Sequence, residues 1–337
     1  MRRLLCCIAC VLALMLEVGA QASAATDRQQ LIDRAQVLLS QGQMDAVIAL
    51  LKPMVKGEDA QLNHLLALAY YGKGDYPSAA THFSRSVASA PRGGKQYRQA
   101  VQLLGLSHYF QGHIKEAIPR LEEAAALAPE NVEISYALGN CYIQSHETAK
   151  SRAVFARIFR LEPESAAAHL VNAQMMIRQQ LEELAEGELR RALELDGRLP
   201  QANFLLGELA IYKANIDQGI ELLKKELAIN PAFAMAYYRL GEAYTRQLRW
   251  EEAIAPLQQS IWLNPFFSGP YIVLGKVYLK KGDLANAENV LRRALRMDPN
   301  NYSGHHLLAQ VLQQANRHEE AKREFELAER LRLAGGN

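Results

Sequence analysis

The apolar positions of the chain follow a helical spacing, and they come in two groups that alternate. In the stretch from 268 to 299 the first group falls at i, i+3, i+4 and i+7, on one face of a helix: Tyr271, Leu274, Gly275 and Tyr278. The second group, Ala287, Leu291 and Ala294, repeats that spacing, and Gly282-Asp283 between the two groups is a turn signal. The pattern predicts two short helices joined by a turn, here named helix A and helix B.

A breaker residue ends this helix pair at a fixed period of 34 residues. Proline recurs at Pro129, Pro163, Pro231, Pro265 and Pro299, and the helix breaker Gly197 takes the place of the missing proline. Proline ends helix B because its ring removes an N–H and disfavours the α conformation of the preceding residue. A period of 34 with helical patterning between the breakers predicts stacked helix-turn-helix units and an all-α fold.

The repeated residues resemble the tetratricopeptide repeat family, whose pattern is W-x2-L-G-x2-Y, then A-x3-F, then P. The nearest match has Tyr237, Leu240, Gly241 and Tyr244 in helix A, followed by Ala253, Leu257 and Pro265. The resemblance implies a right-handed superhelical solenoid of about nine units. We expect three segments after residue 25: an irregular N-terminal capping repeat over 26–59, a solenoid over 60–333 and a disordered tail over 334–337. The solenoid units begin near 60, 98, 132, 166, 200, 234, 268 and 302.

Two positions of the repeat have a physical requirement. A small residue lets helix A approach helix B closely, as at Gly105, Gly139, Gly207, Gly241 and Gly275. The turn position holds Gly74, Gly112 and Gly282 in some units but His146, Gln180, Ala214, Leu248 and Asn316 in others. We expect looser packing where this position departs from glycine.

The first 25 residues differ from everything after them. Arg2 and Arg3 precede an apolar run from Leu4 to Leu16, and small residues follow near Ala24. This layout predicts a cleaved signal peptide over 1–25 and an exported protein, periplasmic or extracellular, because the run is shorter than the roughly 20 residues that span a bilayer. An uncleaved membrane anchor is the alternative. We expect no stable transmembrane segment in the mature chain.

Composition and motifs point away from several function classes. The formal net charge is +2, and the Lys and Arg residues form no basic stripe. We therefore expect no nucleic-acid partner. Cys141 is the one cysteine after the predicted signal, and we expect it to be buried. No zinc motif, nucleophile elbow, phosphate loop or dinucleotide fingerprint is present, so we expect no enzyme activity, metal or cofactor.

The resemblance assigns candidate ligand-binding residues, because in that family helix A lines a concave groove and positions five and nine face the ligand. Position five is Tyr136, Leu170, Phe204, Tyr238 and Ile272, and position nine is Asn140, Gln174, Glu208, Glu242 and Lys276. Arg239 lies on the same helix as Glu242, where it either steers an acidic ligand or pairs with that glutamate. The alternative for the whole set is packing between neighbouring units.

Three functions follow from these observations. The favoured one is an exported, non-enzymatic scaffold that binds a protein or peptide segment in its groove, as part of an envelope-assembly, secretion or exopolysaccharide machine. The second is a structural spacer that interacts through its convex surface or its ends. The third is an enzyme whose site no motif reveals, and it requires perturbed acids or histidines gathered in one cleft.

Overall fold

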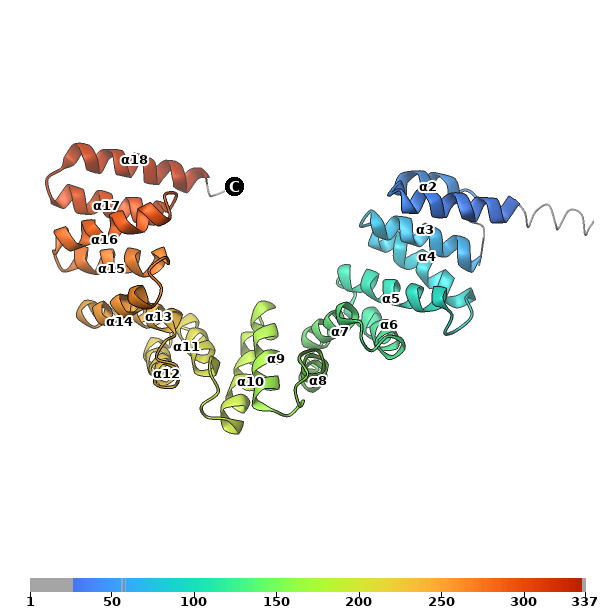
Figure 1. Cartoon of the computed structure of the whole chain (residues 1–337), viewed down its shortest axis with the longest axis horizontal. Coiled ribbons are helices and arrows are strands. Elements are labelled where there is room, and N and C mark those ends of the chain that lie inside the picture. Colours follow the sequence, from blue (N-terminus) through green and yellow to red (C-terminus); the bar gives the residue numbers. More distant parts are fainter. Residues whose placement is uncertain (1–26, 56, 58, 335–337) are drawn as a thin grey trace, which may run out of the picture. The chain divides into compact units, whose positions relative to one another are not determined.

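The computed structural model describes residues 27–55, 57 and 59–334, and these residues form α-helices and no strand (Figure 1). The predicted signal peptide over 1–25 and all but the first residue of the predicted tail over 334–337 lie outside the described residues. The all-α prediction is confirmed. The handedness of the superhelix and the number of helix-turn-helix repeats stay predictions.

The chain divides into two compact units, unit 1 ending at Pro163 and unit 2 beginning at Glu164. This division falls inside the predicted solenoid, whose boundaries also stay predictions. In unit 1, helical residues 27–40 precede α2 (Met44–Leu51), α3 (Ala60–Gly72), α4 (Tyr76–Ser89), α5 (Lys95–Phe110), α6 (Ile114–Leu127), α7 (Val132–Gln144) and α8 (Thr148–Phe159).

Unit 2 continues the same alternation of helix A and helix B. Its helices are α9 (Ala166–Arg178), α10 (Glu182–Leu195), α11 (Ala202–Tyr212), α12 (Ile216–Ile229), α13 (Ala234–Arg246), α14 (Trp250–Leu263), α15 (Ser268–Lys280), α16 (Leu284–Met297), α17 (Tyr302–Gln314) and α18 (His318–Ala334). Within unit 2 each helix packs on the next, as α15 on α16 and α17 on α18 (Figure 1).

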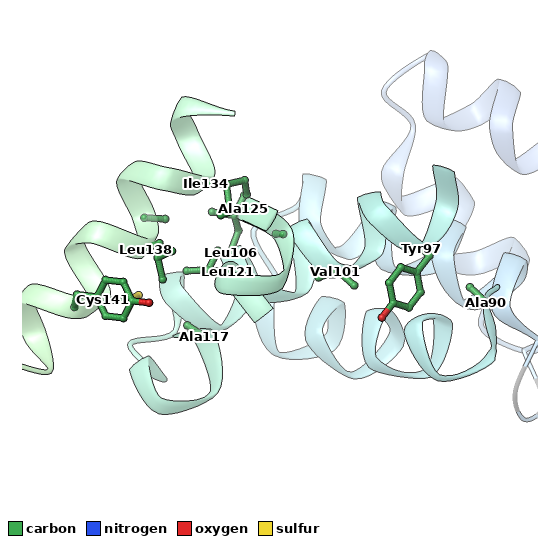
Figure 2. Packing of buried hydrophobic residues seen from close by; sticks show 13 residues of the cluster. Ala90, Tyr97, Val101, Leu106, Ala117, Leu121, Ala125, Ile134, Leu138 and Cys141 are labelled. Atoms are coloured by element: carbon green, nitrogen blue, oxygen red, sulfur yellow. The ribbon is translucent and has the colours of Figure 1, made fainter. Parts of the chain in front are cut away.

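The core of each unit runs between its helix pairs. In unit 1, side chains from α5, α6 and α7 meet in one cluster that includes Leu106, Leu121, Leu138 and Cys141 (Figure 2). Cys141 is buried, as expected, and burial raises the pKa of its thiol to about 12. The thiol is therefore protonated at neutral pH and packs as a small apolar group.

The small residue of helix A touches the residue sixteen positions later on helix B. A Cβ placed on Gly241 would lie 2.5 Å from Cγ of Leu257, and one placed on Gly139 would lie 2.7 Å from Cζ of Phe155. Both distances are shorter than any real contact, so the expected close approach of helix A and helix B is confirmed at these positions.

The turn between helix A and helix B has the same left-handed backbone whichever residue occupies it. The φ angle is 76° at Gly74 and 78° at Gly282, and it is 60° at both His146 and Leu248. A residue with a Cβ is strained in this region, by about 1 kcal/mol or more. The departures from glycine therefore keep the turn and add backbone strain to it.

We expect Leu248→Gly to raise the free energy of unfolding by about 0.5–1 kcal/mol, because glycine adopts positive φ without strain. The leucine side chain is 67% exposed, so its loss removes little packing. Urea unfolding followed by circular dichroism measures the change. Leu248→Ala is the matched control, since it shortens the side chain but keeps the Cβ, and an equal gain from alanine would contradict the strain argument.

A buried carboxylate caps α11 from the helix that follows it. Glu226 on α12 is fully buried, and its Oε1 accepts a hydrogen bond of 2.8 Å from the backbone N–H of Gln201. Its Oε2 accepts a bond of 3.3 Å from the N–H of Phe204. The first N–H groups of a helix have no acceptor within the helix. The Glu226 carboxylate supplies an acceptor to two of these groups in α11.

A polar contact recurs between the turn after a helix A and helix B of the preceding repeat. Nζ of Lys213 lies 2.7 Å from Oε2 of Glu186, and Nη1 of Arg317 lies 2.7 Å from Oε2 of Glu288. The same contact is made by Lys73 with Asp45, by Gln247 with Asp217 and by Lys281 with Glu251. These contacts, all within unit 1 or within unit 2, tie the repeats that make them to their neighbours.

Candidate functional site

The position-five side chains differ in how much surface they leave open. Phe204 is only 8% exposed, and its ring centroid lies 4.9 Å from that of Phe233. Tyr238 is half-buried with its ring 5.0 Å from that of Phe267, edge to face. Packing therefore accounts for Phe204 and for part of Tyr238, which is the alternative that the sequence left open.

The remaining position-five residues keep part of their surface. Leu170 and Ile272 in unit 2 are half-buried. Tyr136 belongs to unit 1, where it is 38% exposed and its ring stands edge to face with Phe155 at 5.8 Å. Leu170, Tyr238 and Ile272 thus form a partly open apolar row on helices A of unit 2, and this row is narrower than the predicted stripe.

The position-nine residues are polar, and the structure gives most of them partners. Asn140 in unit 1 is buried and donates a hydrogen bond of 3.2 Å to the hydroxyl of Tyr109. In unit 2, Gln174 is half-buried and Lys276 on α15 is exposed. The structure thus does not bring the whole row to one place, and the residues that it does bring together are Glu208, Arg239 and Glu242.

Arg239 joins two glutamates from consecutive helices A. Its Nη1 donates a hydrogen bond of 2.9 Å to Oε2 of Glu242 on the same helix. Its Nε lies 2.7 Å from Oε1 of Glu208 on α11, an ion pair without the angles of a hydrogen bond. Arg246 adds a weaker pair, with its Nη2 3.6 Å from Oε1 of Glu242. Arg239 therefore pairs with Glu242, one of the two roles considered from sequence.

Burial is the main influence on the pKa of Glu208. Its pKa is raised, mainly because burial disfavours the carboxylate; Arg239 partly offsets this effect and Glu242 adds to it. Glu208 is thus a half-buried acid whose charged form is disfavoured by burial more than it is favoured by Arg239.

These side chains line a pocket of about 300 Å³ in unit 2. Glu208 and Leu209 come from α11, Arg239 and Arg246 from α13, and Glu182 from the first turn of α10. Ile177, Ile211, Tyr212, Glu242 and Ala243 complete the wall. Sequence reasoning missed Glu182, because acidic residues are common at helix N-termini and carry no specific signal there.

Comparison with known families identifies the repeat. Models described as "Tetratricopeptide repeat" match residues 111–175, 204–265 and 278–331, which together are more than half of the 337-residue chain. The chain belongs to the tetratricopeptide repeat family. No curated protein matches its sequence.

Several solved structures are similar to this chain at low sequence identity. MamA from Desulfovibrio magneticus RS-1 is 19% identical with a TM-score of 0.48, over 51% of this chain and 97% of that one. A chain of the APC/C hetero-tetramer Cut9-Hcn1 is 18% identical with a TM-score of 0.45, over 84% and 55%. A tetratricopeptide repeat protein from Parabacteroides merdae is 19% identical with a TM-score of 0.39, over 76% and 100%.

The tetratricopeptide fold is consistent with a protein-interaction scaffold, and its family is typically non-enzymatic. Within the part of the chain that the structure describes, no three His, Cys, Asp or Glu side chains gather where they could hold a metal ion. In that same part, every helix is too short or too polar to cross a membrane.

Proposed function

We propose that this tetratricopeptide chain is a non-enzymatic scaffold that binds a protein segment on the helix-A surface of unit 2. The observation that carries the proposal is the pocket beside Glu208, Arg239 and Glu242, where charged groups converge next to an apolar wall. A concave site with mostly apolar lining and a few converging polar groups is the usual form of a binding site.

The partly open row on helices A supports the same proposal. Leu170, Tyr238 and Ile272 each keep exposed apolar surface that a bound segment would cover. Gln174 and Lys276, on the same helices A as Leu170 and Ile272, offer polar groups to the backbone or side chains of that segment. An extended or helical peptide fits such a pairing of apolar burial with polar contacts.

Export is part of the proposal, and it is supported by the pattern of residues 1–25. Two arginines, an apolar run and small residues are the layout of a cleaved secretory signal. On this basis the scaffold works in the periplasm or outside the cell, within an envelope-assembly, secretion or exopolysaccharide machine.

A second function, a spacer that interacts through its helix-B side, is favoured by one observation. Trp262 near the end of α14 and Phe266 in the following loop are 75% and 86% exposed. Large aromatic residues are enriched at protein interfaces, so these two mark a surface where a partner would bind outside helices A.

We expect a photoreactive residue at Lys276 to capture a partner several-fold more efficiently than one at Lys225. Lys276 is exposed on α15, a helix A, and Lys225 is exposed on α12, a helix B, so the two lysines form a matched pair within unit 2. The measurement is crosslinking in the native cell envelope followed by mass spectrometry of the adduct.

The same adduct tests both parts of the proposal. Capture from Lys225 alone would contradict helix-A binding and support the spacer. The N-terminus of this chain within the adduct tests export. We expect it to be cleaved near Ser23 or Ala25, and an intact Met1 would contradict cleavage of a signal peptide.

A further inference from the structure

We propose that the pocket between α10, α11 and α13 receives a lysine or arginine side chain of the bound segment. This inference rests on the proposed function, because it assigns the chemistry of one subsite on the same helix-A surface.

The pocket has more acidic than basic groups. Glu182, Glu208 and Glu242 line it together with two guanidinium groups, those of Arg239 and Arg246. Both arginines contact Glu242, at 2.9 and 3.6 Å. Lys213, just after α11, does not line the pocket; it pairs with Glu186, and the charge of Glu182 makes a smaller contribution to its raised pKa. The pocket therefore keeps a net negative charge that an incoming cation would neutralise.

Glu208 is the group best placed to meet that cation. Among the described residues, Arg239 is the cation within 4 Å of its carboxylate, and this contact lacks the angles of a hydrogen bond. The side chain of Glu208 is about one-third exposed, so one side of it is open. Burial raises the pKa of Glu208, as expected for a carboxylate partly removed from water. A lysine or arginine would supply the hydrogen bonds that this carboxylate lacks.

The apolar wall fits the rest of such a side chain. Ile177, Leu209 and Ile211 line the pocket, and the stems of lysine and arginine bury well against such surfaces while the charged end stays polar. Tyr212, which is 76% exposed, adds an aromatic ring to the lining. The volume of about 300 Å³ lies at the lower end of ligand sites, which suits one side chain.

An acidic side chain is the opposite occupant, and the contacts oppose it. It would have to displace Glu242 from Arg239 and Arg246, and it would add a fourth carboxylate to the pocket. Carboxylates crowded into one partly buried pocket repel each other strongly. The observed pairing therefore favours a cation.

The test uses short fluorescent peptides that share one alternating leucine-alanine sequence and differ only in the central residue. Lysine, arginine, norleucine and glutamate are compared by fluorescence anisotropy with the full chain. We expect the lysine and arginine peptides to bind about tenfold more tightly than norleucine, as one charge-assisted hydrogen bond implies. Glutamate is expected to bind most weakly.

Glu208→Gln is expected to abolish the preference for lysine and arginine over norleucine, since it removes the charge and keeps the shape. Glu221→Gln, an exposed residue on α12 outside the pocket, is the matched control and should keep the preference. Circular dichroism checks that both variants are folded, and Glu182→Gln is a second pocket variant, expected to reduce the preference.

The outcomes separate the subsite from the proposed function. Equal binding of all four peptides overturns the cationic subsite and leaves helix-A binding intact. Tightest binding of the glutamate peptide overturns the subsite in favour of an acidic occupant. Failure of every peptide to bind, together with no capture from Lys276, overturns the proposed function and the subsite with it.

Discussion

Phe155→Ala is expected to lower the free energy of unfolding by about 3–5 kcal/mol, the cost of emptying a fully buried aromatic site. Phe155 on α8 is 0% exposed, and its ring fills the space opposite Gly139 on α7. Because no Cβ projects from residue 139, little can move into the cavity that the ring would leave. Urea unfolding followed by circular dichroism measures the loss.

Phe159→Ala is the matched control for this substitution. Phe159 lies one turn later on the same helix and is 50% exposed, so we expect its removal to cost about 1 kcal/mol or less. Similar losses from Phe155→Ala and Phe159→Ala would contradict the placement of Phe155 on the core-facing side of α8.

Glu226→Ala is expected to destabilise the chain by about 2–3 kcal/mol, although it removes a charge from the interior. The carboxylate accepts hydrogen bonds from the N–H groups of Gln201 and Phe204, and its loss would leave both groups without a partner. An orphaned buried donor costs about 1–3 kcal/mol. The change is measured by the urea midpoint.

Two further variants isolate the cause of this loss. Glu226→Gln keeps one acceptor oxygen, so we expect a smaller loss than with alanine. Glu221→Ala, at an exposed site on the same helix, tests the effect of losing a glutamate from α12 and should change stability by less than about 0.5 kcal/mol. A neutral Glu226→Ala would rule out the capping role.

The helices were predictable because their determinants are local or strictly periodic. Gly282-Asp283 marks the turn between α15 and α16, and Asn230-Pro231 marks the end of α12. The spacing of sixteen between Gly241 and Leu257 carries helix packing as well, since each repeat reuses one contact. These signals were sufficient for the fold class and for the small residues of the interface.

The candidate site was less predictable because its partners come from other repeats. Phe204 occupies a position that faces the ligand in the family pattern, yet its ring packs on Phe233, 29 residues later. The capping role of Glu226 is equally invisible in sequence, because the N–H groups that it accepts belong to the preceding helix. A periodic pattern gives the face on which a residue lies and leaves its contact with the next repeat undetermined.

The contacts between the turn after helix A and the preceding helix B affect how unfolding spreads along each unit. Lys213 with Glu186 and Arg317 with Glu288 are partly exposed ion pairs, which solvent weakens. In a linear array, the coupling between neighbours sets whether repeats melt together or one by one. Because salt weakens exposed ion pairs, we expect higher ionic strength to reduce the coupling between these neighbouring repeats and, with it, the cooperativity of unfolding within each unit.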